Sequence, residues 1–398
     1  MLSILHVISR LDPSDGGPPM ALSRLAGTQA HFGAEVTIAA LEPTMKLDDI
    51  LAAYRPVTGF DKIAIEYLSR STVRERLLAR QAGARLTFLA DSHDVTHIHG
   101  IWRPHLLEAT RAARRVGRPY VISPHGMLSN WSLTQKKFKK HVALSLGWRT
   151  ALEQAAFLHV LNQDEGVAVA TVCTPRKLVT LPNGVSLDEL SGQPDPEAVW
   201  NHFPQLRGTP YIMFVGRLHR SKGLDILADA FAQVARAKEG IQLVVIGPEF
   251  GEGDAFNAKI RRLGIQSRVH VLGGIYGPDK IALLKHATCF CLPSRQEGFS
   301  MAILEAMAIG LPVVVSDACH FPEVASEGAG QVVKLDADAF AQAILRLLTD
   351  DALRAQQGTN ARHLAHSRYQ WNSIAQSFIQ AYLRACNSAS IEGAARFA

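Results

Sequence analysis

Residues 289–307 read CFCLPSRQEGFSMAILEAM. The first four residues are apolar and predict a short buried strand, and the Ala-, Met- and Leu-rich end predicts a helix. Glu297 lies in the loop between them, and Glu305 lies about two turns into the helix. In an open α/β sheet, ligands bind at the carboxyl ends of the strands. The segment therefore predicts an α/β fold with a ligand site beside Glu297.

The start of this helix is suited to bind an anion. Its first amides, near Ser300 and Met301, have no partner within the helix and favour negative charge. The two carboxylates can accept hydrogen bonds from hydroxyl groups. An anion flanked by hydroxyl-binding groups suggests a nucleotide sugar, although Glu305 also fits an ordinary exposed helix position.

A second strand-end loop carries cations. Residues 211–227 read YIMFVGRLHRSKGLDIL, in which an apolar strand runs into Gly216 and a helix follows. Arg217, Arg220 and Lys222 lie between the two elements. Arg supplies a planar fork of donors and Lys a mobile point charge, so both suit the diphosphate of a leaving group.

Strands and helices alternate along both halves of the chain, which predicts parallel sheets. In the first half, the expected strands are residues 2–9, 34–40, 95–99, 119–123, 156–161 and 178–181. In the second half, they are residues 211–216, 241–246, 269–272, 289–292, 312–316 and 331–333. A chain of 398 residues is expected to form two domains. No G-x-G-x-x-G motif follows a strand, which disfavours a dehydrogenase.

Glycine and histidine residues follow the expected strands of the first half. Gly16 and Gly17 come after the first strand and allow backbone amides to approach a ligand closely. His125 follows the fourth strand, and His97 and His99 end the third. Strand ends concentrate function, so His125 is the stronger candidate, whereas alternation is expected to bury one of the other two histidines.

The two loops of the second half resemble those of a known enzyme family. Glu297 and Glu305 match the E-x7-E motif of glycosyltransferase family 4, and Gly216–Gly223 matches its G-R-x-x-x-x-K-G element. The resemblance covers nearly the whole chain and is strongest over residues 216–323. Members of this family are retaining sugar transferases with the GT-B fold, in which two Rossmann-like parallel-sheet domains face each other across a cleft. The resemblance implies that fold here.

The resemblance also implies a division of the chain. Residues 1–185 would form the acceptor domain and residues 209–375 the nucleotide-sugar donor domain, joined by a linker at residues 186–208. Residues 376–398 would form a helix that crosses back to the first domain.

Residues that match the family motifs take their expected roles from the family. Arg217 and Lys222 would bind the donor diphosphate. Glu297 would hold sugar hydroxyls and Glu305 the ribose, while His125 would lie against the donor sugar near the reacting carbon. The other expected donor-binding residues are Gly16, Gly17, Gly216, Gly274, Ile275, Gly298, Phe299, Ser300 and Met301.

The acceptor side is less well defined by the resemblance. His97, His99 and Asn183 are assigned to it. Asn183 and Gly184 resemble the family's P-N-G-V-D turn, but Ser186 stands where the acid is usual. Any role that depends on that acid is therefore in doubt.

Two polar residues near these motifs have simpler explanations than catalysis. Arg220 matches no family role and is expected in solvent. Glu165 is placed as the third residue of a helix that Asn162 caps, which accounts for it without chemistry.

Neutralisation by the protein is expected in place of a metal. No D-x-D motif lies near the site, and Asp336-Ala337-Asp338 lies far along the chain. The leaving diphosphate would meet Arg217, Lys222 and helix amides, with no cofactor. The reaction would retain the anomeric configuration. The expected acceptor is a glycan or lipid-linked glycan of bacterial exopolysaccharide, capsule or lipopolysaccharide synthesis.

Two other classes of protein share this scaffold. One is a GT-B enzyme that transfers no sugar to an acceptor, such as a nucleotide-sugar epimerase, or a phosphorylase, whose pyridoxal-binding lysine has no recognisable motif here. The other is a non-catalytic carbohydrate- or lipid-binding protein, which the complete set of matching cations and carboxylates disfavours. The motifs do not distinguish UDP-, GDP- and ADP-sugars and leave the acceptor, the linkage and the oligomeric state open.

Composition favours a cytoplasmic protein. The five cysteines form no C-x-x-C pair, which is typical of a reduced chain without a metal framework. The first strand has no basic leader before it, and no run of about 18 apolar residues is present.

A basic stretch distinguishes the first half. Residues 109–152 contain nine Lys or Arg residues and no Asp or Glu, in a chain of net charge +6. A helical projection over residues 131–146 puts Trp131, Phe138, Val142 and Leu146 on one stripe, Lys136 and Lys140 roughly opposite, and Lys137 and Lys139 towards the flanks. Either the stripe packs on its own domain beneath solvated lysines, or the segment binds an anionic membrane surface. A nucleic acid partner is not expected.

Overall fold

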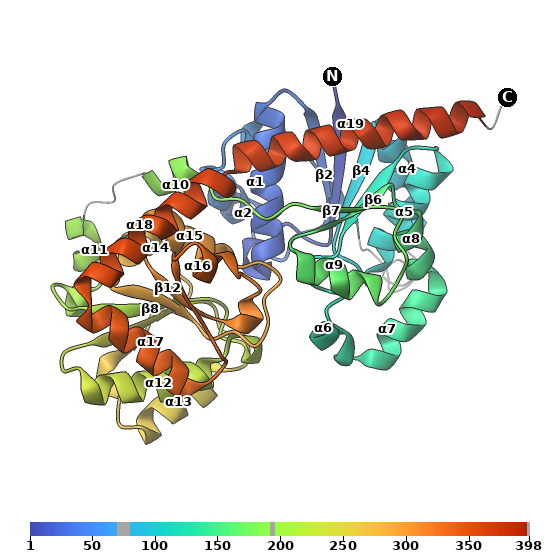
Figure 1. Cartoon of the computed structure of the whole chain (residues 1–398). Helices are drawn as coiled ribbons and strands as arrows, with labels where there is room; N and C mark the ends of the chain where they lie inside the picture. The colour runs from blue at the N-terminus through green and yellow to red at the C-terminus, as the bar shows by residue number, and fades with distance from the viewer. Residues whose placement is uncertain (70–79, 192–195, 396–398) are drawn as a thin grey trace. The chain divides into compact units, whose positions relative to one another are not determined.

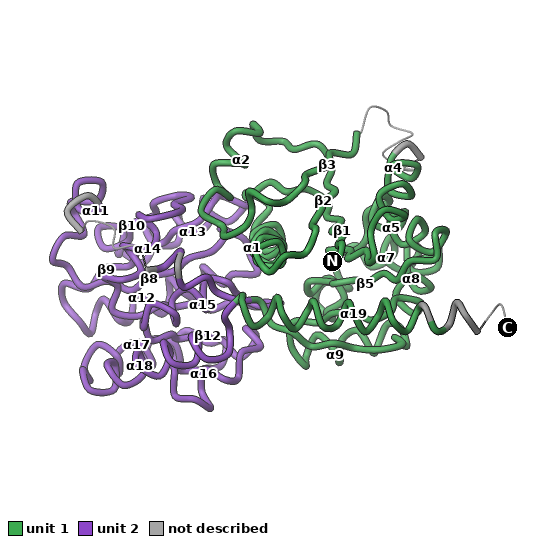
Figure 2. The backbone as a smooth tube through the Cα atoms, turned by 90° about the horizontal axis from the view of Figure 1, so that it is seen from above, with its two compact units in different colours: residues 1–183, 371–398 green, residues 184–370 purple. Residues whose placement is uncertain are grey.

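The chain forms two compact units. The computed structural model describes residues 1–69, 80–191 and 196–395. Unit 1 contains residues 1–183 and 371–398, and unit 2 contains residues 184–370 (Figure 2). Each unit has its own parallel sheet with covering helices, which confirms the predicted pair of Rossmann-like α/β domains.

The sheet of unit 1 has seven parallel strands in the order β3-β2-β1-β4-β5-β6-β7. They are β1 (Ser3–Ile8), β2 (Glu35–Leu41), β3 (Ala64–Leu68), β4 (Val95–His99), β5 (Tyr120–Ser123), β6 (Phe157–Val160) and β7 (Leu178–Thr180). The prediction lacked β3. This edge strand buries only its last residue, Leu68, so it lacks a run of buried apolar residues.

Helices cover both faces of this sheet (Figure 1). The helices of unit 1 are α1 (Gly17–His31), α2 (Leu47–Tyr54), α4 (Arg80–Asp91), α5 (Pro104–Arg115), α6 (Asn130–Thr134), α7 (Lys137–Ala143), α8 (Arg149–Gln154), α9 (Gln163–Ala170) and α19 (Trp371–Ala395). One face packs on α4, α5 and α8 through an aliphatic core that includes Leu86, Leu106 and Leu152. On the other, α1 and α19 lie side by side.

The second face of the sheet is lined with histidines. His97 and His99 are both buried there, and Tyr382 of α19 contacts His97. The expectation that alternation would bury only one of the two is wrong, because residues two apart on a strand point to the same face.

The sheet of unit 2 has six parallel strands in the order β10-β9-β8-β11-β12-β13. They are β8 (Tyr211–Val215), β9 (Gln242–Ile246), β10 (Val269–Val271), β11 (Cys289–Leu292), β12 (Val313–Ser316) and β13 (Gly330–Val333). The main helices are α12 (Leu224–Ala237), α13 (Gly253–Arg262), α14 (Gly277–His286), α15 (Met301–Ile309), α16 (Glu323–Ser326), α17 (Ala337–Thr349) and α18 (Asp351–Arg368). All six strands lie where the sequence predicts them.

The segment expected to be a linker packs onto unit 2. It contains the short helices α10 (Leu187–Ser191) and α11 (Pro196–His202), separated by residues outside the described part of the chain. Val199 and Leu206 are buried in the core of unit 2, because apolar side chains gain free energy when they leave water. The chain returns to unit 1 at Trp371, five residues before the expected boundary at 376.

The predicted helix over residues 131–146 is broken. It comprises α6, α7 and the π-turn Leu144–Trp148, because Lys136 has φ 52° and Gly147 has φ 127°. Its apolar stripe does not pack on unit 1: Phe138 is 80% exposed and Leu146 69%. The docked interpretation of the stripe is therefore wrong.

Lys140 also differs from its predicted position in solvent. Its ammonium donates to the Ser132 carbonyl at 2.6 Å and lies 5.5 Å from the Trp102 ring centroid. Burial, followed by the charge of Lys136, lowers the pKa of Lys140. Lys136, Lys137 and Lys139 are exposed.

Within the described residues, none of the helices has the length and apolar character that a membrane span requires.

Candidate functional site

The carboxylate and the lysine singled out in unit 2 meet directly. Glu297 follows β11 and is 9% exposed, so its carboxylate is largely shielded from water. Lys222 Nζ donates to Glu297 Oε1 at 2.5 Å, and Ser294 Oγ donates to the same oxygen at 2.5 Å. The loop of Lys222 follows β8 and the loop of Glu297 follows β11. Their side chains therefore gather at the carboxyl edge of the parallel sheet, as predicted.

The two loops are also tied together by their backbones. Gly223 has φ 69°, and a Cβ there would lie 1.9 Å from the Pro293 carbonyl oxygen, so only glycine fits. Arg295 donates its backbone N–H to the Ser221 carbonyl at 2.7 Å. Its guanidinium also makes a bidentate pair with Asp225 at 2.8 and 2.7 Å. Arg295 therefore positions the Lys222 loop against the Glu297 loop, a role that sequence reasoning missed.

Arg217 lies at the end of β8 with its guanidinium available. It is half-buried and lies 5.0 Å from the centroid of the Phe250 ring. No ion pair joins it to another residue in the described part of unit 2. Gly247 approaches Gly216 closely, because a Cβ on Gly247 would lie 1.8 Å from the Gly216 carbonyl oxygen. This contact fixes the turn between Gly216 and Arg217. Arg220 is exposed, as expected.

Helix α15 carries the second carboxylate. Ser300 caps the helix by accepting from the backbone N–H of Ile303 at 3.4 Å. Glu305 is 8% exposed, so it is not an ordinary surface residue. Both of its oxygens accept from Lys280 Nζ, at 2.9 and 2.8 Å. Sequence reasoning missed Lys280; the signal was its place in the first turn of the helix after the Gly273–Gly274–Ile275 loop.

The other residues of unit 2 that are predicted to bind the donor contact neighbouring residues of the same unit. Phe299 packs on Phe321 and Tyr369, with ring centroids 5.0 and 5.8 Å away. Met301 and Ile275 are partly buried against the core of unit 2. Gly274 is close to Tyr276, and Gly298 is half-buried in the Glu297 loop.

In unit 1, His125 sits in a strained turn after β5. It has φ 52°, in the left-handed region that non-glycine residues rarely adopt. Glu165 holds the next residue, because its Oε1 accepts from the backbone N–H of Gly126 at 2.6 Å. Asn162 caps α9 by accepting from Glu165 N at 2.8 Å, as predicted. The carboxylate of Glu165 thus has a positioning role that the capping explanation left out.

A cavity of about 290 Å³ lies at the carboxyl ends of β1, β4 and β5. It is lined by His125, His99 and the loop that follows β1, and by two cations, Arg10 and Arg103. Gly16 caps α1 and Gly17 starts it beside this cavity, and a Cβ on Gly17 would meet open space. Sequence reasoning missed both arginines, which no motif marks.

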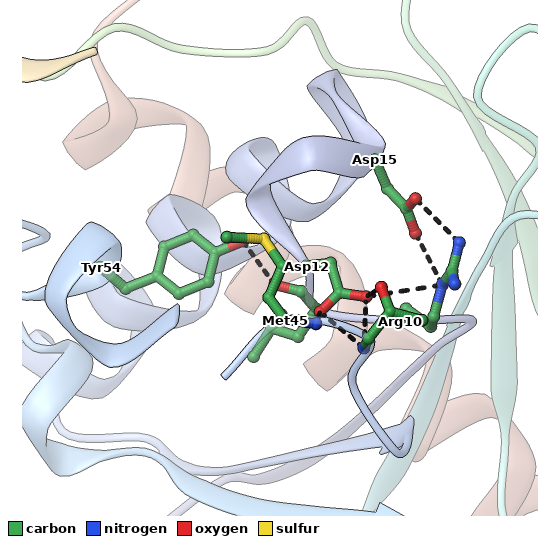
Figure 3. Close-up of polar contacts among 7 residues, drawn as sticks. Arg10, Asp12, Asp15, Met45 and Tyr54 are labelled. Carbon is green, nitrogen blue, oxygen red and sulfur yellow. Dashed lines mark hydrogen bonds and ion pairs between the residues drawn. The ribbon is translucent and has the colours of Figure 1, made fainter. Parts of the chain in front are cut away.

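The loop after β1 is held in place by carboxylates (Figure 3). Arg10 makes a bidentate pair with Asp15, with both distances 2.9 Å. Asp12 is fully buried and accepts from Thr44 N and Oγ1 at 3.0 and 2.7 Å. Tyr54 donates to the Leu11 carbonyl at 2.8 Å. These contacts fix the backbone next to Gly16 and Gly17.

Five histidines, His125 among them, cluster in the interior of unit 1. Burial lowers the pKa of His6 and of His159 to about 4. Burial, with the charge of His159, lowers that of His125 to about 3. The pKa values of His97 and His99 fall well below their usual range for the same reason, with their histidine neighbours adding to the effect. The rings are therefore neutral near pH 7.

One ring nitrogen from each of His6, His97 and His99 lies within 4.8 Å of the other two, as in a metal triad. All six ring nitrogens of these residues have a hydrogen-bond partner within the protein. The protein itself therefore satisfies the hydrogen bonds of these three rings.

Asn183 is buried and is the last residue of the first segment of unit 1.

The chain matches two family models. Residues 201–364 match "Glycosyl transferases group 1", and residues 16–184 match "Glycosyl transferase 4-like domain". Together the two models cover most of both units.

Two curated relatives are mannosyltransferases. The chain is 32% identical over 216 residues to phosphatidyl-myo-inositol mannosyltransferase of Mycobacterium leprae, and it spans 55% of that protein. It is 26% identical to GDP-mannose:cellobiosyl-diphosphopolyprenol alpha-mannosyltransferase of Xanthomonas campestris, with 99% of this chain and 100% of the relative covered.

Solved structures share the fold. The Anabaena protein HepE, in complex with UDP and glucose, has a TM-score of 0.79 at 21% identity, with 96% of this chain and 99% of that chain covered. Sucrose-phosphate synthase from Thermosynechococcus elongatus has a TM-score of 0.75 at 20% identity, with 96% and 98% covered. With both family models and both Rossmann-like units in place, the chain belongs to the family 4 type of glycosyltransferases and has the GT-B fold.

Proposed function

We propose that the protein is a retaining, metal-independent hexosyltransferase that uses a nucleotide-diphosphate sugar. Its acceptor would be a glycan or lipid-linked glycan of bacterial exopolysaccharide, capsule or lipopolysaccharide synthesis. The observation that carries the proposal is the contact between Lys222 and the buried Glu297 at the carboxyl edge of unit 2. This contact joins a phosphate-binding cation to a hydroxyl-binding carboxylate.

The cations of unit 2 would neutralise the leaving diphosphate. Lys222 has three N–H donors and uses one on Glu297, so the others remain for phosphate oxygens. Arg217 offers a planar fork, and the first amides of α15 add partial positive charge. These groups meet the charge that develops as the donor bond breaks, so neither a metal nor a cofactor is required.

The two carboxylates would hold different parts of the donor. Glu297 would accept hydrogen bonds from sugar hydroxyls, with Lys222 and Ser294 fixing its orientation. Glu305 would accept from the ribose, with Lys280 compensating its buried charge. In the transfer, the acceptor oxygen bonds to the sugar on the face that the phosphate leaves. The departing phosphate oxygen takes the acceptor proton.

The cavity of unit 1 would bind the acceptor side of the reaction. Arg103 is exposed at its rim, and Arg10 lines it. Arg103 suits a phosphate-bearing acceptor, whereas Arg10 is paired with Asp15. The Xanthomonas relative is named for a diphosphopolyprenol acceptor. His99 lines this cavity, whereas His97 and Asn183, which are buried, would shape this side without touching the acceptor.

The broken helix of residues 131–146 would bind the inner face of the cell membrane. Phe138 and Leu146 present apolar side chains to solvent, and Lys136, Lys137 and Lys139 are exposed beside them. Exposed apolar and basic side chains on one segment are typical of an element at the membrane surface. The protein would thus be cytoplasmic and peripheral on the membrane.

A panel of UDP-, GDP- and ADP-sugars tests the proposal. One donor should raise the melting temperature, and that donor should then yield a product with its original anomeric configuration in the NMR spectrum. Release of an altered sugar nucleotide without any acceptor would indicate an epimerase instead. No stabilisation by any donor would contradict the proposal.

A further inference from the structure

Hydrogen bonds join the buried histidines of unit 1 into two continuous runs. The first run passes from the Leu181 carbonyl through His159, Ser123 and His97 to Tyr382, with distances of 2.7, 2.6, 2.6 and 2.6 Å. The second passes from Gln29 through His6 and His99 to His125, with distances of 2.8, 2.9 and 3.1 Å.

The first run has only one possible direction when its rings are neutral. A backbone carbonyl can only accept, so His159 carries its proton on Nε2 and its Nδ1 accepts. Ser123 must donate its single hydroxyl proton to that Nδ1, and it therefore accepts from His97 Nε2–H. His97 Nδ1 is left as an acceptor, so Tyr382 donates its hydroxyl proton there.

Tyr382 ends the first run, and Gln29 starts the second. The two residues come from α19 and α1, which pack against each other (Figure 1). Gln29 Nε2 makes no close hydrogen bond to another described residue. Burial raises the pKa of Tyr382, and an interaction with Gln29 partly offsets that effect. The hydroxyl proton of Tyr382 is used on His97, so towards Gln29 its oxygen can only accept, and the group that can donate to it is the amide NH2.

The orientation of Gln29 then sets the second run. Its Oε1 points at His6 Nε2 and can only accept, so His6 is protonated on Nε2. His6 Nδ1 accepts from His99 Nε2–H, and His99 Nδ1 accepts from His125 Nε2–H. The remaining ring nitrogen, Nδ1 of His125, is unprotonated. His125 lines the cavity, so this nitrogen is the one available to a ligand there.

We propose that this hydrogen-bond chain fixes His125 as the Nε2–H tautomer, so that Nδ1 accepts a hydrogen bond from a substrate hydroxyl. Tyr382, Gln29 and Ser123 are positioning residues, because they act on His125 only through other side chains. The chain starts at a backbone carbonyl, which cannot take up a proton, so it sets a tautomer and does not conduct protons away. The contact with a hydroxyl rests on the proposed transferase function, whereas the tautomer does not.

The tautomer can be read directly in the full-length, ligand-free protein. In long-range 1H–15N NMR spectra of protein labelled in its histidine rings, protonated and unprotonated nitrogens resonate far apart. A His125→Asn variant assigns the signals. At neutral pH, Nε2 of His125 should be protonated and Nδ1 should not. This readout needs no active enzyme, so it stands even if every donor fails and the proposed function is wrong.

Two distant variants test whether the chain sets the tautomer. Tyr382→Phe removes the link to Gln29, and Ser123→Ala frees His97 from the Leu181 anchor. Both should shift part of the His125 population to the Nδ1–H form and lower kcat/KM by roughly three- to tenfold, the value of about one hydrogen bond. Tyr120→Phe is the matched control, because this buried hydroxyl donates to the Ala151 carbonyl outside the chain.

Two results would overturn the inference. One is a wild-type His125 protonated on Nδ1 or on both nitrogens. The other is a folded Ser123→Ala protein with the wild-type tautomer and wild-type kcat/KM. Ser123→Ala deletes a single oxygen, so it decides the question if Tyr382→Phe fails to fold.

Discussion

Glu165 Oε1 accepts a hydrogen bond from the backbone N–H of Gly126 at 2.6 Å, and its Oε2 accepts from Leu161 N at 2.8 Å. One buried carboxylate thus holds the turn that contains His125, whose φ of 52° is unfavourable without support. Burial raises the pKa of Glu165 despite these two hydrogen bonds. The sequence explains Glu165 only as the third residue of a helix that Asn162 caps. Its side-chain contacts with Gly126 and Leu161 are visible only in the structure.

Glu165→Gln should loosen this turn. The amide has one acceptor oxygen, so its NH2 group would face a backbone N–H and leave that donor unsatisfied. We expect the free energy of unfolding to fall by about 1–3 kcal/mol and kcat to fall with it. Urea denaturation and donor turnover measure the two effects. Gln163→Ala, an exposed change in the same helix, is the control, and equal behaviour of the two variants would contradict the role.

Arg217→Ala and Lys222→Ala should each lower kcat by roughly 10²–10³, because each removes a cation that meets the leaving diphosphate. Arg220→Ala is the matched control, since its side chain is exposed and lies outside the site. Thermal melts separate the loss of activity from any loss of stability caused by leaving Glu297 without its partner.

EDTA tests whether the transfer requires a metal ion. Turnover by the wild-type protein should change little when the chelator is added, because protein cations neutralise the diphosphate. Loss of activity in EDTA that a divalent ion restores would refute metal independence.

The two carboxylates of unit 2 should separate in calorimetry. Glu297→Gln should impair transfer and leave nucleoside diphosphate binding nearly intact, because its partner is the sugar. Glu305→Ala should weaken the bare nucleotide, because its partner is the ribose. Lys280→Met should have the same effect as Glu305→Ala, since it leaves the Glu305 charge buried without its cation. The reverse pattern would overturn the assignment.

Membrane binding should depend on both the apolar and the basic side chains of residues 131–146. A Phe138→Ser, Leu146→Ser variant should bind anionic vesicles more weakly in co-sedimentation, even at moderate salt. A Lys136, Lys137, Lys139→Ser variant should lose the salt-dependent part, at about 1 kcal/mol per lysine. Lys140 is spared because it packs on Ser132 and Trp102.

Phe88→Ser is the control for the apolar change. Phe88 is also exposed, at 62%, but lies in α4 outside the basic stretch. If all these proteins sediment equally with vesicles, or if none does, the membrane role fails.

Sequence reasoning succeeded where position along a strand decides position in space. Lys222 and Glu297 lie 75 residues apart in sequence, yet both follow parallel strands of one sheet, so their meeting at its carboxyl edge was predictable. The glycine at position 223 has an equally simple explanation, because the loop needs a residue that tolerates positive φ there.

The features that the sequence did not predict share a different cause. Lys280 and the carboxylate of Glu165 contact partners that lie far along the chain, and Arg103 lines a cavity that distant segments form, so no local pattern marks these residues. The stripe of Phe138 and Leu146 had the right period for packing, but what a stripe packs against depends on tertiary structure. The break at Lys136 was hidden because a lysine there gives no turn signal.

The histidine cluster predicts a steep acid sensitivity of unit 1. Well above pH 6.5 the native and the unfolded chain both keep these rings neutral, so the rings leave the free energy of unfolding unchanged. Below that pH the unfolded chain takes up protons that the native chain does not, until His6 and His159 titrate near pH 4. Each buried histidine should then lower the free energy of unfolding by about 1.4 kcal/mol per pH unit.

Urea unfolding of the full chain at pH 7.5, 6.5 and 5.5 measures this slope. Stability should fall less over the first step than over the second, and the fall over the second step should exceed what one histidine can explain. His6→Asn should reduce the slope by about one proton, because it removes one ring that the native fold keeps neutral. A wild-type stability that stays constant down to pH 5.5 would mean that the rings are charged in the native protein, and the hydrogen-bond directions inferred for them would no longer follow.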